Sequence, residues 1–168
     1  NTIEEIAKEK VSVITKDSYV VSCKQKFAVE RIINEKIQKV GAKIKWVEPL
    51  SDEWELGLRG NFQKQNAAVA LGIIKILNKN GWHINRKDIK KGLTSAEWPG
   101  RLETCYWNNK EILIDSAHNP SAAKALANER KNWKNQEKGV YWILGVQKRK
   151  DIESIIREIL EPRDIILL

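Results

Sequence analysis

The spacing of apolar residues predicts alternating helices and strands in the first half of the chain. Apolar side chains that recur every three or four positions indicate helices with one buried face. This pattern covers four segments, at residues 2–9, 25–40, 64–79 and 86–92. Short apolar runs indicate strands at residues 11–14, 19–22 and 43–47. Thr2 and Glu5 have the spacing of a capping box, which favours a helix start at Thr2.

The order of predicted elements changes after the segment AEWPGRLE, residues 96–103, where Pro99 and Gly100 interrupt any regular element. LETCYW and KEILID predict a hairpin across Asn108-Asn109. The remaining pattern is helix, strand, helix, strand, at residues 119–133, 138–146, 151–160 and 164–168. Because strands that alternate with helices favour parallel pairing, we expect a Rossmann-like sheet here. We expect the chain to hold the end of one α/β domain and the start of another.

Composition narrows the class of protein. The chain has 168 residues, of which 42% are hydrophobic and 31% charged, so it can bury a core. No apolar run approaches the ~18–20 residues of a membrane span, so no membrane partner is expected. Cys23 and Cys105 lie far apart without metal-binding spacing, which fits a reducing cytoplasm. The net charge of +8 admits anionic partners, but the basic residues are dispersed, which disfavours a nucleic-acid interface.

The stretch LIDSAHNP, residues 113–120, carries the most suggestive chemistry. It holds one of only two histidines, His118, after the strand-ending acid Asp115. Ligands of open α/β sheets bind where strands end and helices begin, and free N–H groups at a helix start attract anions. The alternative is that Asp115 and Asn119 only cap the helix and His118 is a turn residue. The local pattern leaves both interpretations open.

Five segments together resemble one known family. LIDSAHNPSAAKAL resembles the DGAHNP segment of folylpolyglutamate synthases and dihydrofolate synthases, which belong to the Mur ligase superfamily. The other four resemble motifs of this family in the same order: TIEEIAKEKVSVI, GNFQKQNAAVA, WPGRLE and ILGVQKRKD. The resemblance implies an α/β fold with the end of a Mur-ligase-type central ATPase domain followed by the start of a Rossmann-like C-terminal domain. We expect these parts at residues 1–97 and 98–168.

The resemblance also implies an activity. Family members are cytoplasmic ligases that use ATP and Mg²⁺ to join L-glutamate to the carboxylate of folate or dihydropteroate through an acyl phosphate. We expect the same of the parent protein, acting as a monomer. One alternative is a related Mur ligase of cell-wall synthesis. Another is a basic α/β module that binds nucleotide or nucleic acid without catalysis.

Nucleotide-binding roles follow from the resemblance for three residues. It implies that Asn66 contacts the adenine, Arg101 the ATP phosphates and Asp115 the ribose. The alternatives are a solvated amide for Asn66 and a salt bridge to Glu103 for Arg101.

Three further residues receive catalytic or substrate roles by the same resemblance. His118 matches a histidine that positions the reacting phosphate or glutamate. Lys10 matches a lysine that is carbamylated in the family and so becomes an oxygen ligand for a second Mg²⁺. Its alternative is an ordinary lysine at a helix end. Lys150 is a possible contact for the substrate or a phosphate.

The chain departs from the family pattern at several positions. Phe62 replaces a histidine, Ser116 replaces a glycine, and Val11-Ser12 replaces Ala-Gly. No phosphate-binding GxxxxGK[ST] loop occurs in the 168 residues. We therefore expect this stretch of chain alone to be inactive.

Overall fold

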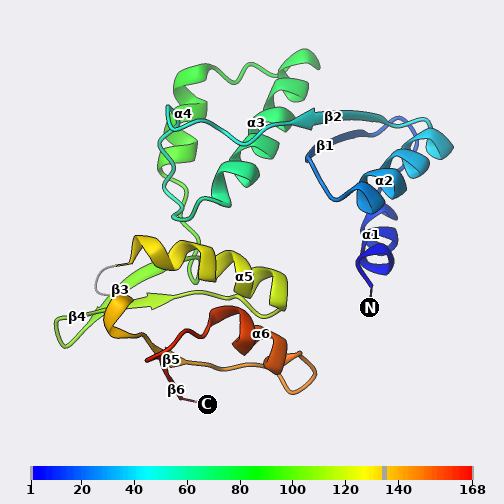
Figure 1. Ribbon diagram of the computed structural model, residues 1–168. Helices are drawn as coiled ribbons and strands as arrows, with labels where there is room; N and C mark the ends of the chain where they lie inside the picture. The colour runs from blue at the N-terminus through cyan, green and yellow to red at the C-terminus, as the bar shows by residue number, and fades with distance from the viewer. Residues whose placement is uncertain (1, 134–135, 168) are drawn as a thin grey trace. The chain divides into compact units, whose positions relative to one another are not determined.

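The computed structural model describes residues 2–133 and 136–167. It divides into two compact units (Figure 1). The first unit contains Asn1–Gly57 and Gln63–Ala96, and the second contains Leu58–Phe62 and Glu97–Leu168. No helix in the described ranges is long and apolar enough to cross a membrane.

The first unit is built around a pair of parallel strands. Its elements in chain order are α1 Ile3–Val11, β1 Tyr19–Cys23, α2 Phe27–Val40, β2 Lys43–Val47, α3 Gln63–Lys79 and α4 Arg86–Thr94. Residues of β1 and β2 pair in register from Tyr19–Lys43 to Cys23–Val47. The α2 helix connects the two strands, as a parallel pair requires. Thr2 and Glu5 form the predicted capping box of α1.

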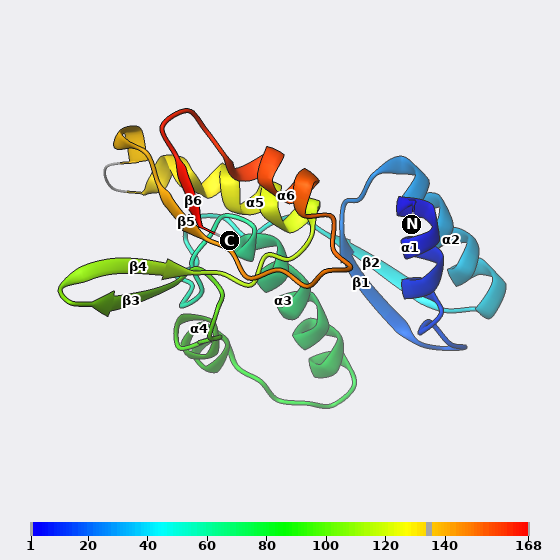
Figure 2. The ribbon, with the colours of Figure 1, turned by 90° about the horizontal axis from the view of Figure 1, so that it is seen from below.

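Helices cover both faces of this strand pair (Figure 2). Ile33 and Ile37 of α2 lie in a cluster with Val20 and Ile44, which project from one face. The α3 helix packs on the opposite face through Gly72. A Cβ atom on Gly72 would lie 2.6 Å from Cγ1 of Val21. A glycine at this position therefore lets the helix backbone approach the strands closely.

The second unit combines a hairpin with an α/β layer. Its elements are β3 Glu103–Trp107, β4 Lys110–Ile114, α5 Pro120–Glu129, the 3₁₀ turns Arg130–Asn132 and Gln136–Lys138, β5 Tyr141–Ile143, α6 Ile152–Ile159 and β6 Ile165–Leu167. The hairpin prediction is confirmed, with Asn108 and Asn109 at φ of +48° and +61°. Asparagine tolerates this left-handed conformation, which two-residue hairpin turns need. The β5 and β6 strands are parallel, as expected around α6.

The segment 58–62 packs into the second unit. Phe62 contacts the core cluster that includes Leu102, Ala123 and Trp142. A Cβ atom on Gly60 would lie within 2.8 Å of both Phe62 and Leu102, and its φ of +107° also favours glycine. The backbone N–H of Asn61 donates to the buried carboxylate of Glu129 at 2.7 Å. Phe62, which stands where the resembled motif has a histidine, is therefore partly buried against the core.

A buried ion pair joins three elements of the second unit. The Arg130 guanidinium, at the end of α5, donates to both carboxylate oxygens of Asp164 at 2.5 and 2.7 Å. The Trp142 indole N–H of β5 and the Val140 N–H donate to the same carboxylate at 2.9 and 2.8 Å. The side chain of Arg130 is only 3% exposed, and that of Asp164 only 1%. Arg130, more than any other group, holds the pKa of Asp164 well below its usual range.

Two predicted strands differ from the structure. The strand predicted at residues 11–14 is wrong, because α1 continues to Val11 and a turn follows in which Ser12 donates to the Glu9 carbonyl. The apolar residues of this segment are explained by tertiary packing, because Ile14 is buried against Ile33 and Ile37. The strand predicted at residues 138–146 is limited to Tyr141–Ile143. Val140, Leu144 and Val146 instead pack on the core from the flanking loops.

Candidate functional site

The segments WPGRLE and DSAHNP meet in the second unit. The Ser116 N–H donates to the Gly100 carbonyl at 2.8 Å. The Leu102 N–H donates to Oδ2 of Asp115 at 3.0 Å, and the Ala117 N–H donates to Oδ1 at 2.8 Å. The Asp115 carboxylate therefore ties the two turns together. It is half-buried, at the end of β4.

The turn that carries Arg101 is held from both sides. Leu102 has a φ of +47°, which is unfavourable for a leucine, and its side chain is buried in the core. Core packing and the bond to Asp115 together maintain this conformation. On the other side, Glu103 accepts the Gly100 N–H at 2.8 Å.

Arg101 itself is exposed. The alternative of a salt bridge to Glu103 is not realised among the described residues, because Glu103 bonds to the backbone of Gly100 instead. The guanidinium of Arg101 is therefore presented on a fixed turn with its donors directed to solvent. A forked guanidinium of this kind suits a phosphate or carboxylate.

His118 lies two residues beyond this junction and is exposed. Its Nδ1 is 2.9 Å from the Ser116 carbonyl oxygen. Because a carbonyl oxygen can only accept, Nδ1 carries the proton, and Nε2 is the ring atom free to meet a ligand. This contact orients the ring, which agrees with a positioning role.

The start of α5 offers fewer free N–H donors than the sequence predicts. Asn119 caps the helix, since its side chain accepts the Ala122 N–H at 2.9 Å and its carbonyl accepts the Ala123 N–H. Pro120 has no N–H. Within the described part of the chain this leaves the N–H groups of Asn119 and Ser121 as available donors. An anion here would depend on Arg101 and His118 more than on the helix start.

Lys150 lies in the loop between β5 and α6, next to the helix cap. Asp151 caps α6 by accepting the Ser154 N–H at 3.0 Å, and bonds to Ser154 lower the pKa of Asp151. Lys150 is exposed. It therefore follows the carboxyl end of a parallel strand, which is where α/β sheets bind ligands.

The first unit holds the other two predicted residues, on different helices. Lys10 lies in the last turn of α1, with its ammonium 2.8 Å from Oε1 of Glu9. Hydrogen bonding from this ammonium lowers the pKa of Glu9. Asn66 is exposed in the first turn of α3, where its side-chain amide donates to Oε1 of Gln63 at 2.8 Å. Gln63 is only 4% exposed. The orienting contact from Gln63 was not predicted, although the glutamine is present in the family motif.

The described residues do not assemble a metal site by themselves. No group of three or more His, Cys, Asp or Glu side chains lies close enough to hold a metal ion within these ranges. Lys10 has one neighbouring acid, Glu9. The described residues could therefore contribute individual ligands to a magnesium site.

Comparison with known proteins places the chain in a family. Residues 101–168 match the family described as "Dihydrofolate synthetase, C-terminal domain". The dihydrofolate synthetase of Saccharomyces cerevisiae is 28% identical over 192 residues, covering 100% of this chain and 44% of that protein. The dihydrofolate synthase/folylpolyglutamate synthase of Bacillus subtilis is 31% identical over 155 residues, covering 78% and 36%.

A solved structure agrees with this result over both units. The crystal structure of folylpolyglutamate synthase from Thermotoga maritima matches with a TM-score of 0.70 and 26% identity, covering 98% of this chain and 44% of that one. The chain spans less than half the length of each of these three relatives. The expected α/β fold is confirmed. This chain belongs to the family of dihydrofolate synthases and folylpolyglutamate synthases.

Proposed function

We propose that the chain is part of an ATP-dependent ligase that adds L-glutamate to the carboxylate of folate or dihydropteroate. The observation that carries this proposal is the junction of WPGRLE and DSAHNP, where Ser116 bonds to Gly100 and Asp115 bonds to Leu102. Formation of an acyl phosphate brings several anions together, so the catalyst must place cations at fixed positions. Arg101 is a cation on a turn held by three hydrogen bonds, which join Gly100 to Glu103 and Ser116, and Leu102 to Asp115, and by the buried Leu102 side chain.

In this proposal the second unit binds the phosphates and the ribose. Arg101 contacts the ATP phosphates through its forked guanidinium. Each carboxylate oxygen of Asp115 accepts one backbone N–H and retains a lone pair for a ribose hydroxyl. His118 uses Nε2 to position the reacting phosphate or the glutamate. Lys150 is the candidate for a further contact with the substrate or a phosphate.

In the first unit, Asn66 is the proposed contact to the adenine. The bond to Gln63 uses one of the two N–H groups of the Asn66 amide. Its remaining N–H and its oxygen form a donor and acceptor pair, which matches the edge of an adenine base. Residues 1–97 are then the end of the central ATP-binding domain, and residues 98–168 the start of the C-terminal ligase domain.

Magnesium would accompany ATP as a counter-charge to its phosphates. A carbamylated Lys10 would supply one oxygen ligand to this ion. We further propose that the intact protein is a cytoplasmic monomer.

The test is an assay of ATP-dependent phosphate release by the full-length protein with glutamate and either folate or dihydropteroate. Arg101→Ala should lower kcat by at least tenfold, because the lost guanidinium acts on the migrating phosphoryl group. Arg157→Ala, which removes an exposed guanidinium from α6 in the same unit, should leave the rate unchanged. Activity only with a UDP-muramoyl peptide would assign the protein to cell-wall synthesis. No activity with either substrate class would favour a non-catalytic nucleotide-binding module.

A further inference from the structure

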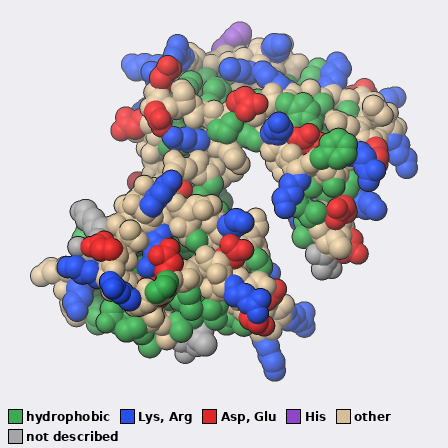
Figure 3. Space-filling view, in the orientation of Figure 1, with side chains coloured by type: hydrophobic (Ala, Val, Ile, Leu, Met, Phe, Trp, Pro, Cys, Tyr) green, Lys and Arg blue, Asp and Glu red, His purple; other side chains and the backbone are tan. Residues whose placement is uncertain are grey.

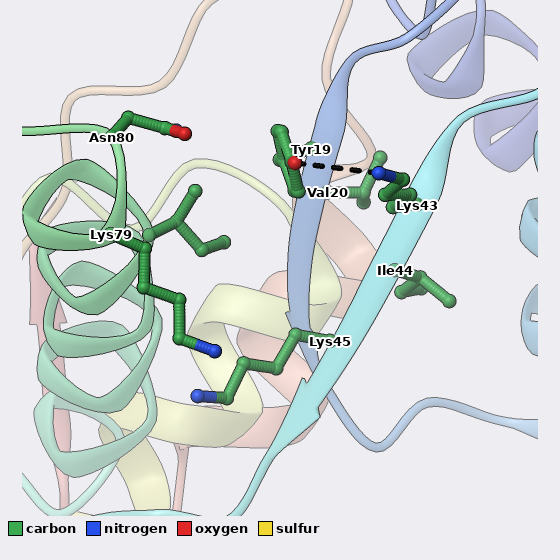
Figure 4. A pocket seen from close by; sticks show the side chains of 8 residues that line it. Tyr19, Val20, Lys43, Ile44, Lys45, Lys79 and Asn80 are labelled. Atoms are coloured by element: carbon green, nitrogen blue, oxygen red, sulfur yellow. Dashed lines mark hydrogen bonds between the residues drawn. The ribbon is translucent and has the colours of Figure 1, made fainter.

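A pocket of about 190 Å³ in the first unit contains none of the candidate site residues in its lining (Figure 4). It opens between the beginning of the two strands and the end of α3. Its polar lining consists of Tyr19, Lys43, Lys45, Lys79 and Asn80.

The fold brings these side chains to one place. Tyr19 is the first residue of β1 and pairs with Lys43, the first residue of β2. Lys45 lies two residues further along β2, so its side chain projects from the same face as that of Lys43. This is the face that α3 covers, and Lys79 is the last residue of that helix. Strand alternation and the position where α3 ends therefore bring Lys45 and Lys79 together, whereas Lys43 turns toward the Tyr19 hydroxyl (Figure 4).

The pocket is strongly positive. Its lining residues include three lysines and no acidic residue, and none of the three lysines forms an ion pair within the described ranges. Lys45 and Lys79 point toward one another (Figure 4). The Lys43 ammonium lies 5.3 Å from the centre of the Tyr19 ring and 3.5 Å from its hydroxyl. The end of α3 contributes about half a negative charge, which three positive charges outweigh.

Like charges held together on a surface favour binding of a counter-ion, because the ion removes their mutual repulsion. A single carboxylate would neutralise one lysine, whereas phosphate groups carry enough charge and acceptor atoms to meet two or three. The volume is below the roughly 300–1,000 Å³ of pockets for drug-sized ligands, so a small group fits best. Lysine and arginine side chains are scattered over the visible face of the molecule, among acidic, apolar and other side chains (Figure 3).

We propose that this pocket binds the phosphate group of a small molecule. It lies at the amino ends of β1 and β2. Ligands of open α/β sheets bind at the carboxyl ends, so this pocket is a second site, separate from the proposed nucleotide contacts. The proposal does not depend on the proposed ligase function.

The experiment is calorimetric titration of the full-length protein with pyrophosphate at constant ionic strength. The variant K45A/K79A should bind pyrophosphate at least tenfold more weakly at this site. K45R/K79R should retain binding, because it keeps both charges. The matched control K87A/K90A removes two exposed lysines from α4 and should leave the affinity unchanged.

Arg101→Ala separates this site from the proposed ligase site. Pyrophosphate binding that persists in R101A and disappears in K45A/K79A supports the pocket. Binding that disappears in R101A and persists in K45A/K79A would assign the ion to the ligase site alone and overturn the pocket proposal. An equal loss in K87A/K90A and K45A/K79A would also overturn it, as an effect of total charge. None of these outcomes bears on whether the protein transfers glutamate.

Discussion

The two units of the chain are held together by different kinds of contact. In the first unit, apolar side chains of α2 and a close approach at Gly72 of α3 enclose the strand pair. In the second unit, buried or half-buried carboxylates of Asp115, Glu129 and Asp164 bond across elements that are distant in sequence. Apolar burial is nearly independent of pH, whereas a buried carboxylate depends on pH and on the direction of each hydrogen bond. The candidate residues Arg101 and His118 belong to the unit that depends on charge.

Removal of Asp164 should produce the largest effect. Asp164→Ala leaves the Arg130 guanidinium buried without its partner, which costs about 3–5 kcal/mol of unfolding free energy. Hydrogen exchange of the full-length protein should locate this loss in the second unit. Glu153→Ala breaks an exposed ion pair with Arg157 in the same unit and should cost roughly 0–0.5 kcal/mol. Similar losses in the two variants would contradict a structural role for the buried pair.

Acid should act on the same pair. The folded pKa of Asp164 is depressed, so its contribution to stability is present above the unfolded pKa of about 3.9 and is lost as pH falls toward the folded value. The second unit should therefore lose stability below about pH 4–5 before the first unit does. Asp164→Asn should flatten this dependence, which urea unfolding between pH 3 and 7 would measure. An unchanged slope in that variant would assign the acid sensitivity to other carboxylates.

Substitution of Asp115 should lower both stability and activity. Its carboxylate accepts N–H groups from Leu102 and Ala117, so Asp115→Asn places an amide donor against one of them and costs about 1–3 kcal/mol. Because Leu102 adjoins Arg101, kcat for glutamate transfer should fall as well. Asp151→Asn alters a carboxylate that only caps α6, and should cost about 1 kcal/mol or less. A normal kcat in D115N would show that the junction does not position Arg101.

The sequence was a good guide where local rules decide the structure. Capping at Thr2, the hairpin turn at Asn108-Asn109 and the strands β1 and β2 each follow from a pattern within a few residues. The family motifs predict that WPGRLE and DSAHNP act together, and the structure shows that the two segments are hydrogen-bonded to each other. Nothing in local spacing indicates that Asp115 would accept the N–H of Leu102, because that bond depends on how the hairpin closes.

Contacts between distant segments could not be predicted in the same way. Arg130 and Asp164 are separated by 34 positions, and each looks like an ordinary surface charge in the sequence. Ile14 led to the opposite error. Its apolar side chain suggested a strand, but Ile14 lies in a turn and is buried by tertiary packing. Both cases arise because burial is a property of the folded chain.

The smallest predicted effect tests the packing of the first unit. Gly72→Ala places a methyl group against Val21, and the overpacking cost of about 1–3 kcal/mol is partly offset by the roughly 1 kcal/mol that alanine gains over glycine in a helix. The net loss should be about 0–2 kcal/mol. Gly92→Ala in α4 has open space around the new methyl group, so it should stabilise the unit by about 1 kcal/mol. Thermal unfolding of the two full-length variants measures the difference. Equal stabilisation in both would mean that α3 can move away from the strands without cost, and that the first unit tolerates changes in packing that the second unit does not tolerate in charge.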